Sequence, residues 1–101
     1  MISATYIHLC DCIGEFSGLN RDLRKAPTTL YAEYKKFAIR NIFAEAVEIV
    51  VSKNITKRDL LDEVEISLRE QRTAEVRGDL KEVRNLSAVM HFLRCLASRV
   101  Y

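Results

Sequence analysis

The hydrophobic positions of this chain recur with the spacing of amphipathic α-helices over nearly its whole length. In the first segment they follow one another at steps of four, three, four and three residues, which places them on one face of a helix. We predict this helix over about residues 3–17, with Gly18 as its stop and residues 18–28 as the longest connection. The positions of this face are Ile2, Tyr6, Leu9, Ile13 and Phe16.

The second apolar segment is hydrophobic on most of its sides. It predicts a helix over about residues 29–53, which begins after Pro27 and stops at Asn54. A helix of this kind is expected at the centre of the fold. Because β-branched residues dominate positions 47–51, a buried strand is an open alternative there, although no partner strand is visible.

Two further helices follow with clear start signals. Thr56 and Asp59 form a short capping box before a helix of about residues 57–76. Its apolar stripe stops after Leu68, so residues 69–77 should extend into solvent, as a charged helical end or a loose segment. Gly78 breaks the chain, and Asp79 opens a last helix over about residues 79–100.

These elements predict an all-α protein, a small four-helix bundle in which short connections favour antiparallel neighbours. The 101 residues suffice for one domain, 1–101, and three glycines with one proline are too few for a sandwich of hairpins. No apolar run reaches the roughly 18 residues of a membrane span. The N-terminus lacks a basic start, and the cysteine count is odd, so a cytoplasmic protein without a disulfide framework is expected.

Histidine and cysteine occur in two pairs with helical spacing. His8 and Cys12 are four residues apart, as are His91 and Cys95, so two helices could in principle present four zinc ligands. The last pair lies opposite the apolar stripe of its helix, and the spacing lacks the Cys-x-x-Cys turn. We therefore predict no metal and no cofactor, and leave open whether these four residues ever bind a metal ion.

The sequence also lacks the patterns of catalytic sites. It contains no glycine-rich phosphate loop and no serine-centred elbow, and no nucleophile–base pair can be nominated. We predict that the protein is not an enzyme and takes no small-molecule substrate.

Charge is unevenly distributed although the net charge is only +2. Residues 59–75 are acidic, whereas residues 21–40 hold six basic side chains against two acids. A basic loop leading into a helix can contact phosphates, so a nucleic-acid-binding regulator is the alternative function. Its contact residues would be Arg21, Arg24, Lys25, Lys35, Lys36 and Arg40.

The leading hypothesis is a non-catalytic protein-interaction protein. The last helix carries more apolar residues than contact with one neighbouring helix would bury. This surplus of apolar surface favours docking on a larger protein or homodimerisation. The chain would act as a regulator, adaptor or inhibitor by occluding its partner, a size and type that suit a phage or plasmid accessory protein. The predicted partner-binding residues are Val89, Phe92, Leu96, Ile66, Arg72, Arg77, Arg84 and Tyr101.

Overall fold

The structure of the chain, a computed structural model, describes residues 3–24 and 29–100; for a few helical residues next to the gap it describes the backbone alone. These residues form four α-helices and, within the described ranges, no strand, which confirms the predicted all-α four-helix bundle. The run 47–51 is helical, so the strand alternative is wrong. The helices are α1 (Ala4–Arg24), α2 (Thr29–Ser52), α3 (Lys57–Arg77) and α4 (Leu80–Ala97).

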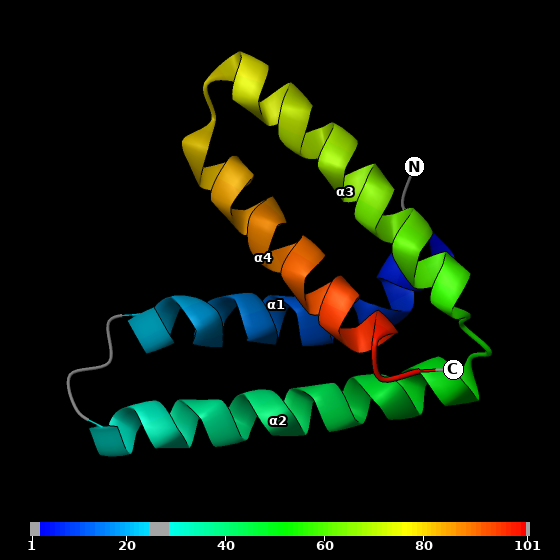
Figure 1. The fold of residues 1–101 in the computed structure, drawn as a ribbon. Helices are drawn as coiled ribbons and strands as arrows, with labels where there is room; N and C mark the ends of the chain where they lie inside the picture. Colours follow the sequence, from blue (N-terminus) through cyan, green and yellow to red (C-terminus); the bar gives the residue numbers. More distant parts are fainter. Residues whose placement is uncertain (1–2, 25–28, 101) are drawn as a thin grey trace.

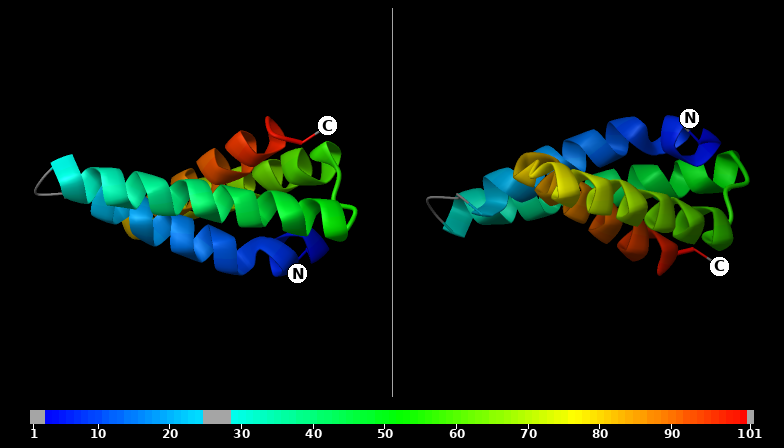
Figure 2. Two further views of the ribbon diagram at one scale, coloured as in Figure 1. Left: turned by 90° about the horizontal axis from the view of Figure 1, so that it is seen from below. Right: turned by 90° about the horizontal axis from the view of Figure 1, so that it is seen from above.

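The four helices are arranged as two antiparallel hairpins (Figure 1). α1 pairs with α2 and α3 pairs with α4, and the second hairpin crosses the first steeply. The crossing lies near the end of α4, so the other end of the α3–α4 hairpin projects away from α1 and α2. The molecule is flat, with extents of 39 × 38 × 19 Å (Figure 2). No helix within the described ranges is both long enough and apolar enough to cross a membrane.

The predicted stop of the first helix at Gly18 is wrong, because α1 continues to Arg24. A glycine inside a helix costs only about 1 kcal/mol relative to alanine. Leu19 packs against the core, and the burial of its side chain favours one more stretch of helix beside α2. The connection predicted over residues 18–28 is therefore much shorter, and Pro27 lies outside the described residues.

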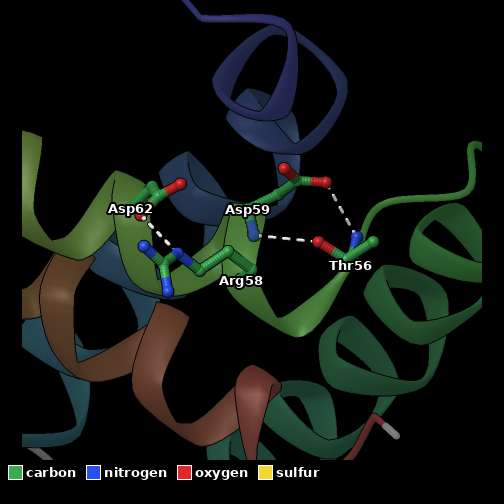
Figure 3. A network of polar contacts seen from close by, with 4 residues as sticks. All are labelled: Thr56, Arg58, Asp59 and Asp62. Atoms are coloured by element: carbon green, nitrogen blue, oxygen red, sulfur yellow. Dashed lines mark hydrogen bonds and ion pairs between the residues drawn. The ribbon is translucent and has the colours of Figure 1, made fainter.

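The other helix boundaries follow the predicted signals closely, except that α4 ends at Ala97 and not at about residue 100. Thr56 and Asp59 form the expected capping box (Figure 3): the Asp59 N–H donates to Thr56 Oγ1 at 3.1 Å, and the Thr56 N–H donates to Asp59 Oδ2 at 2.9 Å. Gly78 ends α3 with φ at 75°, a left-handed conformation that glycine adopts without strain. Asp79 caps α4 by accepting a hydrogen bond from the Glu82 N–H at 3.1 Å.

An aromatic cluster lies where the two hairpins cross. Phe16 of α1, Phe43 of α2 and Phe92 of α4 have ring centroids 4.8 to 5.6 Å apart, and the ring of Phe92 is fully buried. The guanidinium of Arg99 lies 4.5 Å from the centroid of the Phe43 ring and closes this side of the cluster. Three helices are thus held by one set of rings.

A polar contact joins α3 to the start of α1. The Ser3 hydroxyl accepts a hydrogen bond from the Tyr6 N–H at 3.1 Å and donates to the buried carboxylate of Glu63. The carboxylate therefore lies beside the positive end of the α1 dipole, which compensates part of the cost of burying a charge.

The expectation that the second helix lies at the centre is wrong. α2 forms one side of the molecule, and only its inner face packs against other helices (Figures 1 and 2). Its outer face leaves Phe37 62% exposed and Val51 69% exposed, because two crossed hairpins offer no fifth element to cover it.

A matched pair of substitutions on α4 tests this packing. Leu93 is fully buried and Leu80 is 64% exposed. We expect Leu93→Ala to lower the free energy of unfolding by about 2–5 kcal/mol, because it removes buried methyl groups and leaves a cavity. Leu80→Ala should change it by less than about 0.5 kcal/mol. Urea unfolding followed by circular dichroism measures both values, and equal effects would contradict the packing described.

Candidate functional site

Three of the predicted partner-binding residues lie in the core rather than on the surface. Phe92 and Leu96 are 0% exposed and Val89 is 6% exposed. The prediction of an exposed docking face along these residues is wrong for the folded monomer. The reason is the position of α4, which contacts α3 on one side and both helices of the other hairpin on the other, so its wide apolar face is covered.

Four of the remaining predicted residues are exposed but do not form one surface. Arg72, Arg77 and Arg84 lie towards the projecting end of the α3–α4 hairpin (Figure 1). Ile66, 38% exposed, lies about 120° around α3 from Arg72, so these two side chains face different directions. Tyr101 lies outside the described residues.

The end of the hairpin also carries two apolar residues that the sequence reasoning missed. Val76 is 89% exposed and Leu80 is 64% exposed, on either side of the Gly78 turn. A signal for them exists in the sequence. Both fall outside the apolar stripe of their helix, Val76 in the charged segment 69–77 and Leu80 three residues before the stripe of the last helix begins.

This hairpin end is an ordered structure. Residues 69–77 are helical, which settles the choice between a helical end and a loose segment. The fully buried Ala74 permits a close approach of α3 to α4. The Gln71 amide spans the two helices, donating from Nε2 to the Val83 carbonyl at 3.0 Å and to Ser87 Oγ at 2.8 Å. The exposed apolar residues therefore have a rigid support.

Among the basic residues of the alternative prediction, Arg21 lies near the end of α1 and Lys35 and Lys36 lie in the first half of α2, whereas Arg40 lies midway along α2. Arg21, Lys36 and Arg40 are exposed, and Lys35 is partly buried. Lys36 Nζ lies 3.7 Å from Glu33 Oε1, an exposed ion pair within α2. The side chain of Arg24, and Lys25 altogether, lie outside the described residues.

The histidine and cysteine pairs are not assembled into a ligand set. Among the described residues, no three His, Cys, Asp or Glu side chains are placed to hold a metal ion. On α4, Cys95 Sγ lies 3.7 Å from His91 Nε2. On α1, His8 is exposed whereas Cys12 is buried among core residues. Burial, and then the carboxylates of Glu45, Glu15 and Asp11, raise the pKa of the Cys12 thiol to about 11. A neutral thiol is a poor metal ligand.

Comparison with protein families, with curated proteins and with solved structures finds no match for this chain.

The raised pKa of Cys12 gives a testable pH dependence. The folded protein holds the thiol proton up to about pH 11, whereas the unfolded chain releases it near the ordinary value of 9.0. The folded state thus binds more protons between these values, and this contribution to stability, complete below pH 9, is lost as the pH rises towards 11. We expect the difference in unfolding free energy between wild type and Cys12→Ala to narrow over this interval, as measured by urea unfolding. A difference that stays constant from pH 8 to pH 11 would contradict the raised pKa.

Proposed function

We propose that this protein is a non-catalytic interaction protein that acts as a regulator, adaptor or inhibitor by docking on a larger protein. The observation that carries the proposal is the exposure of Val76 and Leu80 at the projecting end of the α3–α4 hairpin. Large apolar side chains at the free end of a rigid arm gain stability when a partner removes them from water.

The residues beside Val76 and Leu80 are of types that are common at the centre of protein–protein interfaces. Arg72 precedes Val76 by four residues on α3, and Arg84 follows Leu80 by four residues on α4, so each apolar side chain shares a helix face with an arginine. Arginine is enriched among the residues that dominate binding energy, because its long stem packs while its guanidinium donates several hydrogen bonds. All three arginines predicted from sequence as anchors, Arg72, Arg77 and Arg84, lie near the end of α3 or the start of α4.

The rigidity of the arm supports a docking role. Because the Gln71 hydrogen bonds and the buried Ala74 hold the two helices together, little conformational entropy is lost when the end binds. The crossed α1–α2 hairpin, at the other end of the arm, would then cover a part of the partner's surface away from the docking point. This shape supports the proposed inhibition or regulation by occlusion.

A double substitution tests the docking surface. We expect Val76→Ser with Leu80→Ser to reduce capture of a partner from a lysate of the source organism at least tenfold, because it removes the apolar contacts without disturbing the core. Quantitative mass spectrometry of the captured proteins, with the wild-type chain as reference, measures this reduction.

The matched control is Ile7→Ser, which alters another exposed apolar residue, 57% exposed, on α1. It should leave the captured partner unchanged. Equal capture by the double variant and by wild type, with thermal unfolding unaltered in both, would show that the hairpin end is not the docking site.

A second candidate function is a nucleic-acid-binding regulator. The observation that favours it is that Arg21 of α1 and Lys36 and Arg40 of α2 are all exposed, on two helices that pack side by side. Basic side chains from two adjacent helices can contact neighbouring phosphates along one strand of a duplex.

This candidate makes a prediction about salt. If the three basic residues contact phosphates, the affinity for a random-sequence DNA duplex falls steeply with salt. The triple change Arg21→Gln, Lys36→Gln and Arg40→Gln then reduces the slope of log K against log salt by about 0.9 for each phosphate that is no longer neutralised. Fluorescence anisotropy measures the slope, with Arg58→Gln and Arg69→Gln as a control elsewhere. Binding that is absent, or insensitive to salt, rejects the candidate.

A further inference from the structure

The outer face of α2 carries an apolar repeat that no other helix covers. Phe37, Ala44 and Val51 follow one another at intervals of seven residues, and all three are exposed, Phe37 by 62% and Val51 by 69%. Positions seven apart drift only about 20° around a helix, so the three form a stripe nearly parallel to its axis. In Figure 2, left, α2 lies across the front of the molecule with no helix in front of it.

Two opposite charges flank this stripe symmetrically. Arg40 lies four residues before Ala44 and Glu48 four residues after it, and both side chains are exposed. Each is displaced by about 40° around the helix from Ala44, on opposite sides of the stripe. The apolar residues have the same symmetry, since Phe37 and Val51 are each seven residues from Ala44.

We propose that this face binds a second copy of the chain, with α2 antiparallel to α2 of that copy and a two-fold axis passing beside Ala44. The axis places Phe37 opposite Val51 of the second copy and Arg40 opposite Glu48 of the second copy, and it makes each contact twice. The face thus matches itself in charge and in the spacing of its apolar residues, and a closed two-fold dimer requires such a self-complementary surface.

The charges select this orientation over its alternative. If the two helices were parallel and in register, Arg40 would face Arg40 and Glu48 would face Glu48, and like charges in an interface are costly. Ala44 at the centre, with its small side chain, permits the helix axes to approach to about 8 Å, the lower end of ordinary helix packing. Phe37 and Val51 then cover the two ends of the contact.

The proposed dimer does not rest on the docking function proposed above. It uses the outer face of α2, whereas the exposed Val76 and Leu80 are at the far end of the other hairpin (Figure 1). A dimer presents two such ends. It also covers Arg40, so dimerisation and phosphate binding through Arg40 exclude each other.

A charge-exchange series tests the dimer. Sedimentation equilibrium of the full chain should show a concentration-dependent dimer. Arg40→Glu alone, or Glu48→Arg alone, should raise its dissociation constant at least tenfold, because each places two like charges opposite each other. The combination of both changes should restore most of the affinity, since the opposite charges then face each other in exchanged positions. Arg69→Glu, on the exposed side of α3, is the matched control and should have no effect.

Cysteine cross-linking tests the position of the axis. In a chain with Cys10→Ser and Cys95→Ser, Ala44→Cys should form a covalent dimer on mild oxidation, because the two-fold axis brings this position against itself. Phe37→Cys should not, since it lies opposite position 51. A monomer at all concentrations, a failure of the double charge exchange to restore affinity, or cross-linking through Phe37→Cys but not Ala44→Cys would each overturn the proposal.

Discussion

The contact of Phe16, Phe43 and Phe92 holds the structure together. These three rings come from α1, α2 and α4, and they lie at the place where the two hairpins cross. Each hairpin alone buries only the strip between its own two helices, and two helices with one shared strip are marginal in water. The crossing adds a common core that neither hairpin has, so the fold depends on rings that are far apart in sequence.

A core concentrated at one crossing leaves both hairpins with projecting ends. The aromatic cluster contributes little to the stability of these ends, which depend on local contacts. In the α3–α4 hairpin these contacts are the Gln71 hydrogen bonds and the packing of the buried Ala74. The same geometry moves α2 from the expected centre to one side of the molecule. Within one copy of the chain, therefore, only the inner face of α2 buries its apolar side chains, and the outer face is exposed to solvent.

The sequence predicts the number, order and most boundaries of the helices, because these depend on local signals. These signals act within a few residues of the chain. They are the Thr56–Asp59 capping box, the left-handed conformation of Gly78 and the capping of α4 by Asp79. The failures concern what one helix does to another. The helix continues past Gly18 because the side chain of Leu19 packs against the core. The pattern of the last helix alone predicts that Phe92 is exposed, whereas the crossing hairpin buries it. The angle at which two hairpins cross depends on many side chains together, and the periodicity of apolar residues in each helix does not predict it.

The exposed apolar residues differ in their regularity, and this difference bears on the kind of partner proposed for each group. Val76 and Leu80 lie on two helices beside a turn and have no internal symmetry, so the surface that fits them need not resemble their own. Phe37, Ala44 and Val51 are evenly spaced along one helix, with Arg40 and Glu48 placed symmetrically about the middle residue. A surface with this symmetry is matched by its own copy turned through 180°, and an unrelated partner has no need of it. The irregular surface therefore favours a different protein as its partner, and the regular one favours a second copy of this chain.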